Sequence, residues 1–171
     1  MRIRTEGIQD HEAVYQLNVE AFGHREEEAQ LVERIRASEG FIPELSIVAE
    51  MDHQLAGHIL LSKASVVDED KEHEVIVLAP IAVKPDFQKQ GVGAQLIQEG
   101  IRKTKELGYG AIFLIGHASY YPKFGFVPAR TYGFELKQFE VPDEVFMVCE
   151  ITEGFLKDWS GELRYPDSFF S

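Results

Sequence analysis

Residues 75–94 read VIVLAPIAVKPDFQKQGVGA, and this stretch decides the fold. The apolar run Val75–Val83 ends at a Pro-Asp turn, after which glycines at positions 91 and 93 open a helical pattern. The first N–H groups of a helix have no intrahelical partner, and the aligned peptide dipoles add partial positive charge at that end. Because glycine lacks a Cβ, an anion can approach the backbone closely there. The stretch therefore predicts a buried strand that leads into an anion-binding loop.

Two common phosphate-binding patterns do not fit this loop. The chain contains no G-x-x-x-x-G-K-[ST] run. The pattern G-x-G-x-x-G also fails, because Ala94, Gln95 and Leu96 follow Gly93 and the third glycine is missing. The pattern that is present is Q-x-x-G-x-G over residues 88–93. Taken alone, it fits a helix start with glycines for tight packing equally well.

A second pattern follows the apolar run 111–115. It is Y-x-x-x-G-F, from Tyr121 to Phe126. In this order, the two patterns resemble those of the GNAT superfamily, the acyl-CoA-dependent N-acyltransferases, and in particular its small uncharacterised bacterial acetyltransferases. The paired resemblance covers about residues 45–128. Two separate patterns in the right order favour this family over a chance match.

The resemblance implies an α/β (α+β) fold with a single central mixed, mostly antiparallel sheet and helices on both faces. Two parallel strands, here 75–83 and 111–115, are expected to splay apart around an acyl-CoA. Periodicity and capping residues predict the elements outside this pair. Asp10 is expected to cap a first helix that ends at Gly23, and further helices are expected over 26–38 and 91–107. Strands are expected over 1–6, 45–50, 55–64 and 73–83, with a charged hairpin tip over 68–72. A length of 171 residues predicts one domain, here a GNAT-type N-acetyltransferase domain over residues 1–171.

The chain is acidic, with 17 Lys and Arg against 29 Asp and Glu and a net charge of −12. This charge opposes nucleic acid as a partner, because binding it requires clustered cations. It favours cationic substrates such as amines, although solubility alone explains it equally well. The diphosphate of an acyl-CoA must then be held by backbone amides and a few cations such as Lys89.

The remaining features of the sequence indicate the cellular compartment and bear on whether a membrane or a metal is a partner. The single cysteine, Cys149, excludes a disulfide framework and lies in an apolar run, which predicts a small buried side chain. No leader pattern opens the chain, and its longest apolar run is too short to cross a bilayer. We therefore expect a cytoplasmic protein with no membrane partner and no metal. The aromatic tail, residues 158–171, is expected to pack onto the core or onto a second subunit of a homodimer.

The resemblance also assigns site residues. It gives acetyl-CoA's pantetheine arm to the backbone of Ile81, Ala82 and Val83. It gives the pyrophosphate to the following loop: Gln88, Lys89, Gln90, Gly91, Val92, Gly93 and Ala94. Proline cannot donate to a ladder, so Pro80 predicts a bulge that frees backbone groups for the thioester, or a kink that only shapes the sheet.

Tyr121 matches the family tyrosine that acts as general acid toward the departing thiolate. The alternatives are a packing role or a hydrogen bond to sulfur without proton transfer. In the family this tyrosine lies on a short helix, so its neighbour Tyr120 is expected to point elsewhere on that helix and pack. For the general base, His117 is the first choice because imidazole titrates near neutrality. The other candidates are a water relay and the side chains of His58, Glu72, Glu74, Glu26, Glu27 and Glu28.

The sequence therefore predicts an N-acetyltransferase that transfers the acetyl group of acetyl-CoA directly to a primary amine in a ternary complex. One alternative is a non-catalytic acyl-CoA-binding sensor or scaffold of the same fold. Another is a relative that binds a different phosphorylated ligand. The sequence fixes neither the amine acceptor nor the length of the acyl chain.

Overall fold

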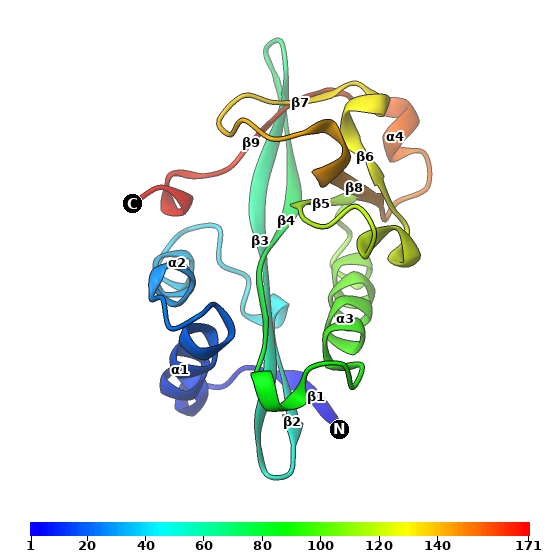
Figure 1. Ribbon diagram of the computed structural model, residues 1–171. Helices are drawn as coiled ribbons and strands as arrows, with labels where there is room; N and C mark the ends of the chain where they lie inside the picture. Colours follow the sequence, from blue (N-terminus) through cyan, green and yellow to red (C-terminus); the bar gives the residue numbers. More distant parts are fainter.

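The computed structural model describes all 171 residues, which form a nine-stranded sheet with helices on both faces (Figure 1). The strands are β1 Arg2–Thr5, β2 Ser46–Met51, β3 Gln54–Asp68, β4 Lys71–Val83, β5 Ala111–Ile115, β6 Phe126–Pro128, β7 Phe134–Leu136, β8 Phe146–Glu150 and β9 Gly161–Arg164. The helices are α1 His11–Ala21, α2 Glu27–Arg36, α3 Val92–Glu106 and α4 Phe155–Asp158.

The strands run in the order β1-β2-β3-β4-β5-β8-β6, and β9 pairs with both β3 and β7. Two pairs are parallel, β4 with β5 and β7 with β9, and the other pairs are antiparallel. Helices α1 and α2 lie on one side of the sheet, and α3 lies on the other (Figure 1). The predicted mixed, mostly antiparallel sheet with helices on both faces is confirmed.

The parallel strands β4 and β5 separate soon after they meet. Their ladder consists of Ile76 opposite Ile112 and Val77 opposite Phe113. Beyond this point the strands diverge, and β4 runs on toward the start of α3 (Figure 1). The last residues of β4 stay paired with β3 on the other side, so the edge of β4 that faces β5 is open. The predicted splayed pair is confirmed.

A bulge in β4 lies where Pro80 predicts one. Ile59 of β3 pairs with Ile81, whereas Leu61 pairs with Leu78, so β4 carries one extra residue between these pairs. The extra residue changes which side chains face α3, because side chains alternate along a strand. As a result, Leu78 and Ile81 both contribute to the hydrophobic cluster beneath α3.

Helix α3 lies close to the sheet because glycines lie on both sides of the contact, Gly57 in β3 and Gly100 in α3. A Cβ on Gly57 of β3 would lie 2.7 Å from Val92 Cγ1, and a Cβ on Gly100 would lie 2.9 Å from Leu61 Cδ1. These separations are shorter than carbon atoms tolerate, so larger residues would push the helix away. The close packing fixes the position of the first turn of α3, and with it the loop that precedes the helix.

The structure differs from the sequence prediction in two local details. The β3–β4 hairpin is longer than predicted, since β3 reaches Asp68 and β4 starts at Lys71, which leaves only residues 69–70 in the turn. Asp10 precedes α1, but its carboxylate does not cap the helix. It accepts hydrogen bonds from Arg4 Nη1 at 2.6 Å and from the Gly7 N–H at 2.7 Å.

The C-terminal tail packs onto the core. Strand β9 pairs with residues 65–67 of β3, and the Trp159 ring stacks on His73 with a centroid distance of 4.3 Å. Tyr165 is buried beside Phe169. Cys149 is also buried, as predicted, and burial raises the pKa of its thiol to about 11. None of the helices combines the length and the apolar character that crossing a membrane requires.

Candidate active site

A cavity of about 440 Å³ brings the two sequence patterns together. One wall comes from the end of β4 and the loop that opens α3, and the other comes from the segment around the tyrosines. The lining residues are Val83, Phe87, Gln88, Lys89, Gly91, Val92, Gly93, Ala94, Tyr120 and Lys123. Residues about 30 positions apart in the chain thus share one cavity, which neither pattern alone requires.

The loop presents a row of free backbone donors. The Gln88 N–H bonds to the Pro85 carbonyl oxygen, and the Gln95 N–H bonds to the Gly91 carbonyl oxygen. The N–H groups of residues 89–94 between them donate to no protein acceptor. Lys89 has a φ of 64° and Gly91 a φ of 84°, so the backbone turns through left-handed conformations that make successive N–H groups converge. This geometry suits an anion.

The charged side chains that line the cavity also favour an anion. Lys89 and Lys123 line it, and no aspartate or glutamate does. Neither lysine forms an ion pair with a protein carboxylate. On a chain with a net charge of −12, this is a local region of positive charge. Together, the amides and the lysines can hold a phosphate or diphosphate group.

The two glycines of the loop serve different purposes. Nothing lies within 4 Å of where a Gly91 Cβ would be, so position 91 needs glycine for its positive φ. A Cβ on Gly93 would lie 3.2 Å from the Tyr120 hydroxyl oxygen, so position 93 needs glycine for a close approach. The Tyr120 hydroxyl therefore lies beside the first turn of α3.

Of the residues assigned to the pantetheine arm, only Val83 lines this cavity. Ala82 is buried and Ile81 is half-buried. All three belong to the part of β4 whose edge toward β5 is open, so backbone groups there are free of a partner strand. An extended ligand chain can pair with such an edge.

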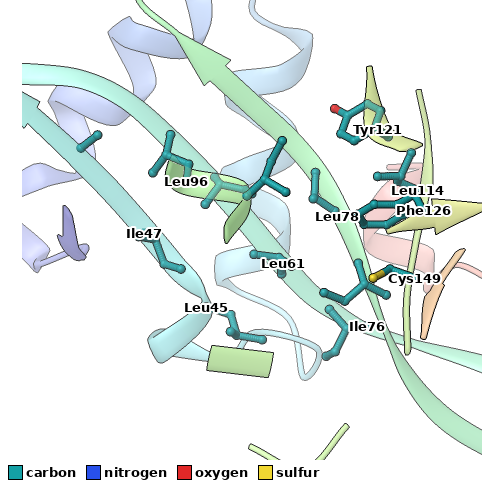
Figure 2. Close-up of a cluster of buried hydrophobic side chains, with 14 of the residues drawn as sticks. Leu45, Ile47, Leu61, Ile76, Leu78, Leu96, Leu114, Tyr121, Phe126 and Cys149 are labelled. Atoms are coloured by element: carbon teal, nitrogen blue, oxygen red, sulfur yellow. The ribbon is translucent and has the colours of Figure 1, made fainter. Parts of the chain in front are cut away.

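Tyr121 lies at the point where β4 and β5 diverge. It is 9% exposed and shares a buried cluster with Leu78 and Leu114, the first residues beyond the last paired positions of the two strands. Its ring packs edge-on against Phe126, and Figure 2 shows the hydroxyl pointing away from that ring. No protein group hydrogen-bonds to the hydroxyl, and burial raises its pKa to about 12. The phenol is therefore fully protonated at neutral pH.

Tyr120 and Lys123 are the site residues that the sequence prediction missed. Tyr120 was expected to point away from the site, but it lines the cavity. The segment is a 3-10 turn over Tyr121–Phe124, with Tyr120 just before it, so α-helical spacing does not apply. The signal for Lys123 was a basic residue inside the second pattern of an otherwise acidic chain.

Among the candidate bases, His117 lies next to the tyrosine segment, and its side chain forms no hydrogen bond or ion pair within the protein. It is exposed just after β5, and its carbonyl oxygen accepts the Tyr120 N–H at 3.1 Å. The carboxylates have other partners: Glu26 with Tyr15, Glu28 with Arg25, Glu72 with Ser65, and Glu74 with Tyr109 and Lys63. Glu27 lies in the first turn of α2, where its charge complements the helix dipole.

His58 of β3 is buried, and its side chain belongs to a series of linked polar contacts that is separate from the cavity. Its Nε2 lies 3.0 Å from Ser46 Oγ, which donates to Glu6 Oε1 at 2.8 Å, and Glu6 pairs with Arg36. The Nδ1 atom has no partner. Burial lowers the pKa of His58 to about 4, with Arg36 adding to the effect and Glu6 opposing it. A fully buried imidazole cannot contact an acceptor amine, so His58 is a structural residue.

A larger cavity, of about 580 Å³, lies elsewhere, around the paired ends of β3 and β4 and the tail. Glu72, Glu74 and Arg164 are among its mostly polar lining residues. Neither sequence pattern contributes to it, and it lacks the row of free N–H groups. We find no group of three or more His, Cys, Asp and Glu side chains arranged to hold a metal ion.

Comparisons with known proteins agree with this geometry. The family model described as "Acetyltransferase (GNAT) family" matches residues 11–126, and the chain belongs to this family. It is 34% identical over 135 residues to the uncharacterized N-acetyltransferase YjhQ of Escherichia coli K12, covering 79% of this chain and 74% of that protein. It is 30% identical over 143 residues to the uncharacterized N-acetyltransferase YhbS of the same strain, covering 83% of each chain. The family assignment makes the protein an acetyltransferase.

Solved structures show the same fold. The GNAT family N-acetyltransferase YhbS from Escherichia coli, in complex with CoA, superposes with a TM-score of 0.90 at 26% identity, covering 99% of this chain and 92% of that chain. A GNAT family acetyltransferase from Brucella melitensis, in complex with acetyl-CoA, has a TM-score of 0.78 at 27% identity, covering 98% and 97%. Both similarities extend over almost the whole chain.

Proposed function

We propose that this protein is an acetyl-CoA-dependent N-acetyltransferase that transfers the acetyl group directly to a primary amine in a ternary complex. The supporting observation is that the Q-x-x-G-x-G loop and the tyrosine segment line one cavity, which presents free N–H groups, two lysines and no acid. The similarity to structures that hold CoA and acetyl-CoA supports the choice of donor.

In this proposal the donor extends from the loop to the vertex of the splayed strands. Its diphosphate accepts hydrogen bonds from the N–H groups of residues 89–94, with Lys89 supplying charge. The pantetheine arm pairs with the open edge of β4 at Ile81–Val83. The thioester then reaches Tyr121, which lies where the strands diverge. The bulge at Pro80 leaves backbone groups free near the thioester carbonyl, where they can stabilise an oxyanion.

The reaction joins the amine nitrogen to the thioester carbonyl carbon and gives a tetrahedral oxyanion. The C–S bond then breaks, and the sulfur leaves with its bonding electrons. The Tyr121 phenol donates its proton to the sulfur as the bond breaks, and the proton that the nitrogen loses returns through water to the phenolate, which restores the phenol. Because burial raises the pKa of Tyr121 to about 12, the phenol is always present as the donor.

We propose His117 as the group that accepts the proton from the amine, either directly or through water. Its imidazole is exposed at the end of β5 and has no competing side-chain partner. An alkylammonium has a pKa of ~10.4, so the acceptor must lose a proton before it attacks. Replacement of His117 by Gln should lower kcat/KM and remove the acidic limb of the pH–rate profile, because only a neutral imidazole can accept a proton. An unchanged pH–rate profile would leave a water relay as the base.

The acid role is tested by Tyr121→Phe in an assay of thiol release with a productive amine. We expect kcat to fall by about 100-fold, with the acetyl-CoA Kd changed less than about twofold, because the ring still fills its packed site. Tyr132→Phe is the matched control, since Tyr132 is exposed outside the cavity and its loss should leave kcat unchanged. Equal turnover by Tyr121→Phe and the wild type would refute the acid role. Acetyl-CoA binding without thiol release across a broad amine panel would favour a sensor instead.

We also propose that residues 1–171 act as one acetyltransferase domain. Strand β9, near the end of the chain, pairs with β3 in the middle of the sheet, so the tail is part of the same folded unit. A single cooperative unfolding transition is the expected result. Homodimer formation stays a prediction, which sedimentation velocity can test.

A further inference from the structure

Lys123 is a cation without a protein carboxylate partner among the residues that line the anion-binding cavity. Its Nζ lies 4.1 Å from the centroid of the Tyr120 ring, and both residues line the cavity. Lys123 forms no salt bridge, although the chain carries 29 acidic residues. A lysine held over an aromatic ring has part of its motion restricted in advance.

Tyr120 brings a second donor to the same place. Its ring packs edge-on against Tyr121 and Phe124, with centroid distances of 5.2 and 5.3 Å, which fixes its orientation. Its hydroxyl lies beside Gly93, whose N–H is one of the free donors of the loop. The hydroxyl has no protein hydrogen-bond partner and is free to donate to a ligand at that N–H.

We propose that Lys123 and Tyr120 form a cation–aromatic clamp that closes the phosphate site from the side opposite the amide loop. The Lys123 ammonium neutralises the diphosphate, and the Tyr120 hydroxyl donates to the oxygen that also accepts from the Gly93 N–H. The clamp rests on the proposed binding of acetyl-CoA. The clamp recognises the diphosphate of the donor and does not contact the acyl group.

The location of the clamp favours the diphosphate over the separate 3′-phosphate of CoA. The Tyr120 hydroxyl marks the first turn of α3, where the free N–H groups converge, and Lys123 is held against the same ring. The two donors therefore line the same cavity as the loop. A cation directed at the 3′-phosphate would not need to share this cavity with the first turn of α3.

The experiment compares acetyl-CoA Kd values for Lys123→Gln and Tyr120→Phe by isothermal titration calorimetry. We expect Lys123→Gln to weaken binding by about tenfold, with a smaller loss at high salt because screening already weakens the ion pair. Tyr120→Phe keeps the ring and should weaken binding by about fivefold. Lys84→Gln is the matched control, since it removes the same charge from a nearby lysine that hydrogen-bonds Gln54 outside the cavity.

Acetyl-dephospho-CoA, which lacks the 3′-phosphate, distinguishes the two phosphate sources. The proposal requires the loss caused by Lys123→Gln to be the same for both donors. A loss that disappears with acetyl-dephospho-CoA would overturn it, because Lys123 would then bind the 3′-phosphate. Equal affinities of Lys123→Gln, Lys84→Gln and the wild type would also overturn it while leaving the proposed function intact. Absence of binding by the wild type would instead refute the proposed function.

Discussion

The buried His58 predicts a specific dependence of stability on pH. Its folded pKa is about 4 against an ordinary value of 6.5, so protonation favours the unfolded chain. The contribution to stability is therefore complete above pH 6.5 and is lost as the pH falls toward 4. At about 1.4 kcal/mol per pKa unit, linkage gives a loss of about 2 kcal/mol between pH 8 and pH 5 and about 3 kcal/mol in full.

Urea denaturation at pH 8, 6.5 and 5 measures this loss as a change in the free energy of unfolding. The window is suitable because the lowered carboxyl pKa values of Asp10 and Glu99 affect stability only at more acidic pH. His58→Leu should remove most of the dependence, since Ser46 keeps its bond to Glu6. His11→Gln is the control.

His11 Nε2 lies 3.9 Å from Glu6, so it is the other histidine next to this polar chain. His11→Gln should keep the loss between pH 8 and pH 5. If the free energy of unfolding of His58→Leu fell by as much as that of the wild type between pH 8 and pH 5, about 2 kcal/mol, the assignment of the effect to His58 would be wrong. A wild-type protein with constant stability across the window would refute the depressed pKa itself.

Three further predictions concern packing and the loop. Gly91→Ala should weaken acetyl-CoA binding severalfold in calorimetry, because its φ of 84° costs an alanine about 1 kcal/mol; an unchanged Kd would contradict this. Gly57→Ala should lower stability by about 1–3 kcal/mol in urea denaturation through its contact with Val92; a neutral effect would mean that α3 shifts freely. Cys149 should react with iodoacetamide at least about 100-fold more slowly in the folded protein than in urea, since burial raises its pKa to about 11; equal rates would contradict its burial.

The sequence predicts the central part of the fold well because the signals there are local. A continuous apolar run, a proline within it and two glycines after it define β4, its bulge and the start of α3. Strand β5 is confirmed at its predicted bounds of 111–115. Each of these signals follows from a conformational preference of the residues themselves.

The parts that sequence does not predict depend on long-range contacts. Strands β7 and β9 are three and four residues long, and their pairing with each other and with β3 is set by burial of Phe134 and Leu163. No local pattern marks such short strands. Likewise, the direction of Tyr120 depends on a 3-10 turn in place of an α-helix, and short segments of the two types share the same composition.

The choice between candidate bases depends on burial, which the sequence does not give. His117 has an open position but no hydrogen bond that orients it. His58 has a hydrogen bond but no access to substrate. Sequence alone treats both as histidines near apolar strands, and burial separates them.

Isothermal titration of acetyl-CoA into the wild-type protein tests the central claim most directly. The free N–H groups of residues 89–94 and the two lysines of the cavity predict one binding site per chain, with a Kd below about 100 μM. No detectable binding of acetyl-CoA or CoA at concentrations well above this value would contradict the account.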